Sequence, residues 1–274
     1  MTLLDLPKIA MEVYGVHTIE LVSEFFRSQT AGYLNQLRRT LTRHQARVHR
    51  IAVDQGSIGS AEPGERRTSI EALKQWFFVA RAIDAGAIRV NTDDFEPLVQ
   101  MLVERRPLPI DGILFNWRSR TPEDQRDALE RCADAYAELA TVQVKVLIEN
   151  HGRATGDPTN IAYLLDSVKS PWLATCPDNH NPYDENAWEA GTHVLAPRAY
   201  TAHVKISGYD PRGIQTFPSP YGESRIQDLP QFLAILRDEG YHGPLNLDYN
   251  FAVSNEEEGA RKGLAYLRDL VARA

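Results

Sequence analysis

The stretch VKVLIEN (144–150) decides the fold class. Its Val-Leu-Ile run lacks the apolar–polar alternation of a strand that has one face in water. Strands covered on both faces read as continuous apolar runs, and such strands are typical of parallel sheets with helices on either side. The stretch therefore predicts a central, doubly covered strand that ends at Glu149 and Asn150.

Six further segments on either side of this stretch have the same character. Each is short and apolar, and most end in polar or acidic residues. They are HTIELV (17–22), HRIAVD (49–54), AIRVN (87–91), WLATCPD (172–178), YTAHVKIS (200–207) and PLNLDYN (244–250).

Segments with helical spacing of apolar residues lie between these strands. Gly15 is expected to end the first helix, and Thr121 followed by Pro122 is a typical helix start. The predicted helices are residues 3–13, 33–48, 69–86, 121–139, 160–168, 184–196, 228–240 and 256–271. Helices that alternate with apolar strands predict an α/β fold, here a (β/α)8 TIM barrel.

The 274 residues suit one such barrel, and no change in composition divides them, so we expect a single domain over 1–274. The count of strands is the weak point. The chain begins with a helix, and the clear strands number one fewer than a barrel needs. Either the barrel closes with an irregular or missing first strand, or ILFNW (113–117), within an unusual connection (92–120), completes it.

Composition excludes several classes of protein. A net charge of −7 argues against a nucleic-acid partner, which needs a clustered basic surface. No uncharged apolar run is long enough to span a membrane, and the N-terminus does not resemble a secretory signal. We therefore expect a cytoplasmic protein whose Cys132 and Cys176 are thiols.

Four of the later predicted strands each carry a side chain near the C-terminal end that can bind a metal: Glu149, Asp178, His203 and Asp248. In a parallel barrel these strand ends converge on one face. Three carboxylates are expensive to bury together without a cation. With one imidazole they form a mainly oxygen donor set suited to Mn²⁺, Mg²⁺ or Co²⁺, with Zn²⁺ as a further candidate.

These segments also resemble a known family. VLIENHG, TCPDNHN, AHVKISGYD and GYHGPLNLDYN, followed by EEEGARKGLAYLRDL, are similar to the xylose isomerase-like TIM barrels, the sugar phosphate isomerase/epimerase superfamily. AMEVYGVHTIEL resembles the early helix–glycine–strand segment of that family. The resemblance covers most of residues 3–271, and its motifs specify the superfamily better than the substrate.

The resemblance implies one divalent ion, for which we expect Mn²⁺, that chelates two oxygens of a sugar. Glu149, Asp178 and His203 match the family's ligands, whereas Asp248 stands where the family usually has Glu. Asn181 replaces a frequent substrate-binding His.

The resemblance also implies the chemistry. Glu149 and Asp248 would face opposite sides of the substrate and transfer protons through a metal-stabilised enediolate, giving isomerisation or epimerisation. The neighbouring His180 could compensate for the loss of a histidine at 181.

Other polar residues near strand ends are candidates for the substrate pocket. Lys205 would either bind a substrate oxygen, with a catalytic role, or pair with a neighbouring acid. Asn150 would orient neighbouring ligands. The remaining candidates for substrate binding are His151, Glu20, Asn91 and Arg212.

Three alternatives to a sugar isomerase differ in what they require. A lyase, such as a dehydratase of a keto-sugar, keto-inositol or dehydroshikimate-like compound, would use the same residues. A DNA-repair nuclease would need extra histidines at early strand ends, where this chain has VDQGS and VNTDD, and is disfavoured. The departures at Asp248 and Asn181 leave open a barrel that binds without catalysis. In the enzymatic cases the partner is a small sugar-like molecule, and self-association into a homo-oligomer stays open.

Overall fold

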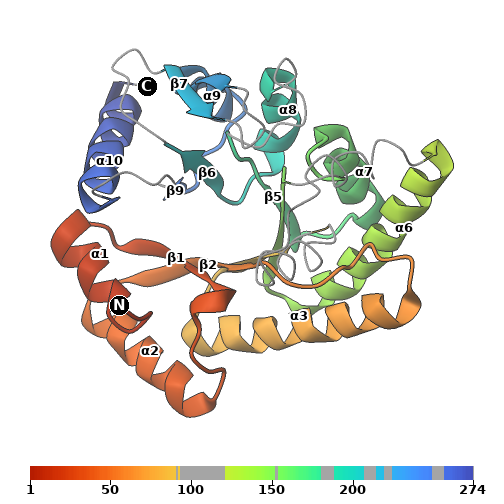
Figure 1. The fold of residues 1–274 in the computed structure, drawn as a ribbon, viewed down its shortest axis with the longest axis horizontal. Coiled ribbons are helices and arrows are strands. Elements are labelled where there is room, and N and C mark those ends of the chain that lie inside the picture. Colours follow the sequence, from red (N-terminus) through yellow and green to blue (C-terminus); the bar gives the residue numbers. More distant parts are fainter. Residues whose placement is uncertain are drawn as a thin grey trace.

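The fold was analysed in a computed structural model, which describes residues 1–90, 92, 121–151, 154–179, 188–206, 214–218, 224–248 and 256–273. Helices and strands alternate along the chain, and the helices surround the strands (Figure 1). The connection 92–120 lies outside the described residues except for Thr92, so the proposed strand at 113–117 stays a prediction.

All seven clear strands of the sequence prediction are present. They are β1 (Thr18–Val22), β2 (Arg47–Val53), β3 (Ala87–Val90), β4 (Lys145–Glu149), β5 (Leu173–Cys176), β6 (Ala202–Lys205) and β9 (Leu245–Asp248). The first five form one parallel sheet in chain order, and β6 pairs with β9 in parallel. Parallel bridges from Thr175 to Ala199 and from Asp178 to His203 join the two groups. This succession of neighbouring parallel strands is that of a (β/α) barrel.

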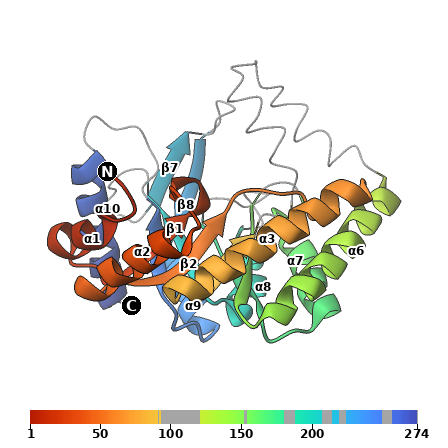
Figure 2. The same ribbon diagram turned by 90° about the horizontal axis from the view of Figure 1, so that it is seen from below.

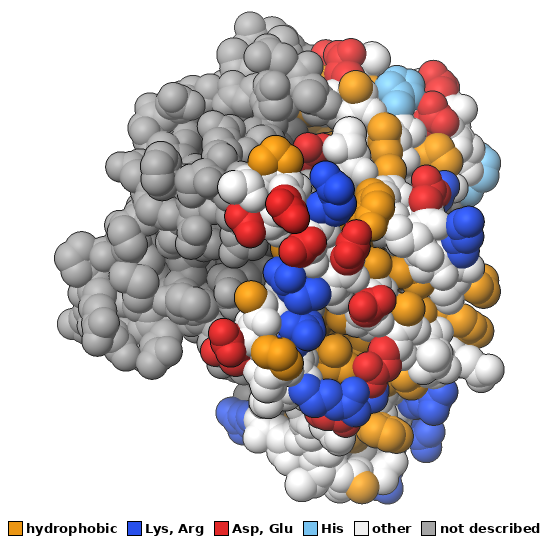
Figure 3. Space-filling view, turned by 90° about the vertical axis from the view of Figure 1, so that its right-hand side faces the viewer, with side chains coloured by type: hydrophobic (Ala, Val, Ile, Leu, Met, Phe, Trp, Pro, Cys, Tyr) orange, Lys and Arg blue, Asp and Glu red, His pale blue; other side chains and the backbone are white. Residues whose placement is uncertain are grey.

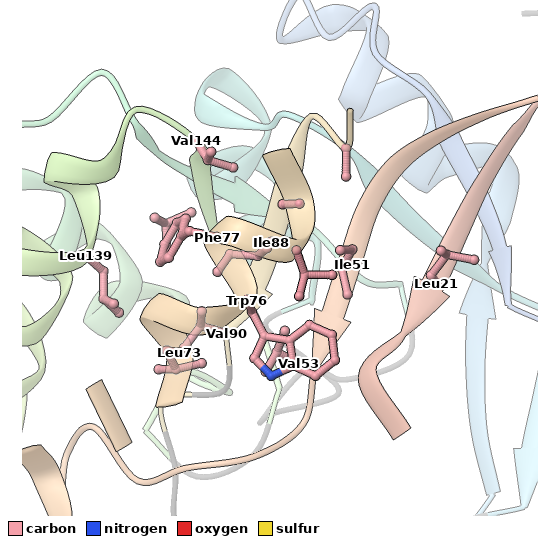
Figure 4. Packing of buried hydrophobic residues seen from close by; sticks show 14 of the residues in the cluster. Leu21, Ile51, Val53, Leu73, Trp76, Phe77, Ile88, Val90, Leu139 and Val144 are labelled. Atoms are coloured by element: carbon pink, nitrogen blue, oxygen red, sulfur yellow. The ribbon is translucent and has the colours of Figure 1, made fainter. Parts of the chain in front are cut away.

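The strand interiors are buried on both faces, as the apolar run in β4 predicted. Val146, Leu147 and Ile148 are completely buried, and every residue of β3, β5 and β6 is buried. Figure 4 shows the outer layer of this core, where Trp76 and Phe77 from α3 (Pro63–Ile83) pack against residues of β2 and β3. Burial of this layer fixes the register of the strands, and therefore the side of the barrel on which each strand end lies.

The helix layer closes where the two ends of the chain meet. α10 (Glu256–Arg273) lies beside α1 (Leu6–Tyr14), as Figure 1 shows. Arg268 donates to the backbone oxygens of Tyr14 and Gly15 at 3.1 and 3.0 Å. Arg261 donates to Val13 O at 3.0 Å. These bonds satisfy carbonyl groups at the end of α1, which helices otherwise leave without partners.

The remaining helices are α2 (Ala31–Arg43), α6 (Pro122–Leu139), α7 (Pro158–Val168), α8 (Trp188–Leu195) and α9 (Leu229–Asp238). Thr121 caps α6 as predicted, in a capping box with Asp124. Two predicted helix boundaries were wrong by five or six residues. α2 ends at Arg43 because β2 pairing begins at Arg47, and α3 begins at Pro63, six residues before the first predicted residue.

The sequence analysis missed an antiparallel hairpin between β6 and α9. Its strands are β7 (Ile214–Pro218) and β8 (Ser224–Asp228), and Asp228 caps α9 by accepting a bond from Gln231 N at 3.0 Å. The hairpin interrupts the strand–helix alternation on which the prediction relied.

The structure bears on two predictions, the state of the cysteines and the lack of a membrane-spanning segment. Cys132 and Cys176 are buried free thiols, as predicted. In the part of the chain that the structure describes, no helix is both long and apolar enough to cross a membrane.

Candidate functional site

The site is built from residues on or just after three consecutive strands, near the end of the barrel where β4 and β5 terminate. Glu149 is the last residue of β4, Asp178 follows β5 by two residues, and His203 lies in β6. The bridge between Asp178 and His203, with a hydrogen bond from His203 N to Pro177 O at 2.8 Å, sets these two residues side by side. The barrel backbone therefore brings the three side chains to one point.

The three side chains form a compact, buried set of metal-capable donors. His203 Nδ1 lies 3.0 Å from Glu149 Oε1 and 3.3 Å from Asp178 Oδ2. One donor atom from each residue lies within 4.8 Å of the other two, and all three residues are buried. Neighbouring ligands of an octahedral ion with bonds of about 2.1 Å are about 3 Å apart, so the spacing fits a divalent cation.

Glu20 and Arg50 hold the opposite side of the His203 ring. Glu20 Oε2 lies 3.1 Å from His203 Nε2 and 2.7 Å from Arg50 Nε, and the Arg50 guanidinium also contacts His203 Nε2. A guanidinium only donates, so the Arg50 contact requires an unprotonated Nε2, whereas the Glu20 contact requires a protonated Nε2. In the tautomer that donates from Nε2 to Glu20, the Nδ1 lone pair faces Glu149 and Asp178. A metal-binding histidine needs this arrangement, in which a carboxylate fixes the ring and its tautomer.

Arg89 holds the second oxygen of Glu149. Its Nε lies 2.9 Å from Glu149 Oε2, and its guanidinium also bonds to Asp54. Glu149 Oε1 is thereby left facing His203. Both Arg50 and Arg89 are buried, which is rare for arginine unless carboxylates pair with it.

Lys205 links the compact set to Asp248. Its Nζ lies 2.9 Å from Asp178 Oδ2 and 4.0 Å from Asp248 Oδ2. Asp248 does not belong to the group of three donors, and its side chain is 32% exposed. Three of the four predicted ligands are therefore brought together, with the fourth beyond Lys205.

The charges at this site change the acidity of its members. Burial alone would raise the pKa of Glu149, but the charges of Arg89 and His203 outweigh burial and hold the pKa well below its ordinary value. The pKa of Asp178 is lowered in the same way, because Lys205 and His203 outweigh burial. Burial raises the pKa of Asp248, against the pull of Lys205.

The cations are affected in the opposite direction. Burial would lower the pKa of Lys205, but Asp178 and Glu149 outweigh burial and raise the pKa to about 12. Burial and Arg50 would lower the pKa of His203, whereas Glu20 and Glu149 raise it well above its ordinary value. A bound cation would take the place of a proton at His203 Nδ1, since a histidine ligand must be deprotonated at the bonding nitrogen.

The charge balance gives a second test of fit for a metal ion. With His203 neutral, the cationic side chains of this cluster are two fewer than its carboxylates among the described residues. The carboxylates are Glu20, Asp54, Glu149, Asp178 and Asp248, and the cations are Arg50, Arg89 and Lys205. One divalent ion would offset this difference, so both donor geometry and charge fit a metal.

Comparison with known proteins agrees with this architecture. The family model described as xylose isomerase-like TIM barrel matches residues 10–270. The chain belongs to this family. No curated protein matches the chain in sequence.

Several solved structures share the fold at low sequence identity. The 3-keto-D-glucoside 4-epimerase of E. coli is 13% identical, with a TM-score of 0.71 over 98% of this chain and 94% of that one. The D-allulose 3-epimerase of Methylomonas sp., in complex with D-allulose, is 15% identical, with a TM-score of 0.68 over 97% and 90%. A xylose isomerase-like barrel of Mycobacterium smegmatis, in complex with magnesium, is 13% identical, with a TM-score of 0.64 over 99% and 90%.

Two asparagines brace the strand ends of this xylose isomerase-like barrel. Asn150 donates to Asp178 O at 2.9 Å and accepts from Asp178 N at 2.7 Å. Asn179 accepts from Lys205 N at 2.8 Å. Asn150 thus holds the backbone of Asp178 in place.

The other predicted substrate contacts are distributed differently. Glu20 lies against His203 and Arg50, and its role as a substrate contact stays a prediction. His151 directly follows the site on the β4 side, and burial lowers its pKa. Four candidates lie outside the described residues: Asn91, His180, Asn181 and Arg212.

Sequence reasoning missed Arg50 and Arg89 at this site. Each interrupts an otherwise apolar strand, in HRIAVD and AIRVN. A charged residue inside a doubly covered strand must point into the barrel toward an opposite charge, so this interruption was a usable signal.

Proposed function

We propose that residues 1–274 form a single barrel domain that isomerises or epimerises a sugar, or a related polyol or keto compound, with one divalent ion. The main support for the proposal is the buried set of metal-capable donors that three consecutive strands, β4, β5 and β6, bring together. The donors belong to Glu149, Asp178 and His203. The sugar epimerases among the similar structures support the substrate class, and the magnesium complex supports a divalent ion.

Glu149, Asp178 and His203 would hold the ion, with Asp248 nearby as a fourth acidic group. A divalent ion there would supply Lewis-acid polarisation of a substrate carbonyl or hydroxyl. The donor set favours Mn²⁺, Mg²⁺ or Co²⁺, and we propose Mn²⁺.

The proton transfers fall to the chain's own carboxylates. Glu149 removes a proton from a carbon next to the carbonyl, while Arg89 holds the second Glu149 oxygen in place. Asp248 is more exposed and returns a proton. Delivery to the other face of the same carbon gives an epimer. Delivery to the neighbouring carbon, with the hydroxyl proton passing from one substrate oxygen to the other, gives an isomer.

Lys205 positions the substrate in this scheme. Its ammonium group lies between Asp178 and Asp248, at 2.9 and 4.0 Å, and carries three donor hydrogens. A substrate oxygen that accepts one of them would be placed between the two carboxylates.

Solvent isotope exchange tests the function. The protein loaded with Mn²⁺ is incubated in D2O with a panel of ketoses, inososes and keto-acids, and products are analysed by NMR and mass spectrometry. We expect deuterium at one carbon next to a carbonyl, loss of exchange on chelation, and recovery with Mn²⁺. Glu149→Gln should lose exchange, whereas the exposed control Glu130→Gln should keep it.

Two results would contradict the proposal. If the Glu149→Gln variant still exchanged deuterium into the substrate carbon, Glu149 would not be the base. A product that has lost one water would assign a dehydratase reaction in place of isomerisation.

A further inference from the structure

An open cleft lies at the end of the barrel opposite to the metal-capable side chains. It is formed by the C-terminal parts of α2 and α3 and by the start of β2. Arg47 is the first residue of β2, whereas Glu149 is the last residue of β4, so the two sites lie at opposite ends of parallel strands. Figure 2 shows α2 and α3 side by side.

The charged residues of this cleft are almost all arginines. They are Arg38, Arg39, Arg43, Arg47 and Arg81, with Asp84 as the one carboxylate. Their formal charge is +4 in a chain with a net charge of −7. We call this feature the arginine cleft.

The guanidinium groups of the arginine cleft have no carboxylate partners among the described residues. No ion pair within 4.0 Å joins any of the five to another residue that the structure describes. Two of them bond to neutral acceptors: Arg47 Nε donates to Thr18 Oγ1 at 3.0 Å, and Arg81 donates to Val142 O. The positive charge of the cleft is therefore not neutralised by the chain described.

Arginines elsewhere on the surface are commonly paired. Arg67 lies 2.9 Å from Glu138, Arg198 lies 2.7 Å from Asp166, and Arg261 lies 2.9 Å from Glu257. Figure 3 shows acidic and basic side chains intermixed over another face of the molecule. The cleft departs from this pattern.

Stabilisation of the helices explains why some, but not all, of the arginines occur in the cleft. Arg43 and Arg81 lie in the last turns of α2 and α3, where a positive charge complements the helix dipole. Arg39 stands one turn before Arg43, and like charges at that spacing repel. Arg38 and Arg39 thus add positive charge without a side-chain bond to any other described residue, whereas Arg47 bonds to Thr18.

We propose that the arginine cleft binds a ligand that carries two or more phosphoryl groups. One guanidinium group can donate two parallel hydrogen bonds to two oxygens of one phosphate. This bidentate contact strengthens binding and fixes the orientation of the phosphate. A phosphoryl group carries about −1.5 to −2 at neutral pH, so two of them match the +4 of the cleft. This site is separate from the carboxylate cluster and does not depend on the proposed reaction.

Calorimetric titration of the full-length chain tests the proposal. Inorganic triphosphate, pyrophosphate and orthophosphate are the probes, in buffer with EDTA so that no divalent ion bridges probe and protein. We expect saturable binding of triphosphate at one site, at least about tenfold tighter than that of orthophosphate. Arg39→Gln/Arg43→Gln should weaken triphosphate binding at least about tenfold, since two charged contacts are lost.

A matched control separates the site from net charge. Arg126→Gln/Arg237→Gln removes two exposed arginines from α6 and α9 and should bind triphosphate as the unaltered chain does. Triphosphate should raise Tm in the unaltered chain and in this control, but not in Arg39→Gln/Arg43→Gln.

Three results would overturn the proposal. They are the absence of saturable triphosphate binding, equal weakening in the two double variants, and binding of a single-stranded oligonucleotide without binding of triphosphate. The last result would assign the cleft to nucleic acid.

Discussion

At the end of the barrel where β4, β5 and β6 terminate, charged side chains are buried and interlocked, whereas at the end where β2 begins they are exposed and mostly of one sign. Both arrangements occur on the same strand: Arg50 is completely buried against Glu20, and Arg47, three residues earlier, is exposed in the arginine cleft. A buried charge is destabilising unless an opposite charge pairs with it, whereas an exposed charge is solvated by water and can be left unpaired until a ligand binds.

This difference predicts that the same kind of substitution has unequal effects at the two ends. Removal of a charge from the interior leaves its partner desolvated and unpaired, which is expensive. Removal of an exposed charge changes stability little.

The largest effect is expected for Glu149→Gln. General-base catalysis contributes about 10²–10⁴ to rate, so solvent exchange at the substrate carbon should fall at least that far. The amide is close in size to the carboxylate, so far-UV circular dichroism should stay unchanged. A variant with normal spectrum and normal exchange would remove Glu149 from the chemistry.

Arg50→Met should have the largest effect on stability. It leaves Glu20 without its guanidinium partner in a buried site, and we expect the free energy of unfolding to fall by about 3–5 kcal/mol. Denaturant unfolding in EDTA measures this change. The control Arg47→Met, on the same strand, should change stability by no more than about 0.5 kcal/mol. Equal losses would show that the two ends do not differ as described.

Glu20→Gln tests whether the contact between Glu20 and His203 orients the histidine for metal binding. Residues that orient a metal-binding histidine through its far nitrogen typically change metal affinity by about 10–100-fold when replaced. We expect a loss of Mn²⁺ affinity in that range, with a shift in the His203 tautomer seen by nitrogen NMR. Glu24→Gln, an exposed neighbour, is the control. Unchanged affinity together with an unchanged tautomer would show that Glu20 is structural only.

The smallest effect belongs to the arginine cleft. Arg39→Gln/Arg43→Gln should alter the free energy of unfolding by no more than about 0.5 kcal/mol. Relief of repulsion between the two arginines and loss of the Arg43 charge from the last turn of α2 oppose each other, so the net change should be small, and added salt should screen both contributions. Thermal unfolding at two ionic strengths is the measurement, and a clear loss of stability would mean that the arginines support the fold.

The strands and most helices could be predicted because their signals are local. Continuous apolar runs such as that of β4 and the capping sequence at Thr121 are visible in a few residues. The β7–β8 hairpin was missed because pairing depends on which segments meet in space, and nothing in its sequence was as strong as an apolar run.

The site was predictable to the same extent. Strand ends converge in any parallel barrel, so Glu149, Asp178 and His203 could be grouped from the positions of their strands. The contacts of Arg50 and Arg89 depend on strand register and on the direction of side chains into the barrel, which the spacing of residues alone does not give. The arginine cleft requires the packing of α2 against α3.

The most direct test of the central claim is electron spin-echo spectroscopy of the Mn²⁺-loaded chain, combined with metal analysis. The account predicts one tightly bound Mn²⁺ per chain with one directly coordinated histidine nitrogen, and His203→Gln should abolish that nitrogen signal. A chain that binds no stoichiometric Mn²⁺, or a nitrogen signal that persists in His203→Gln, would contradict the account.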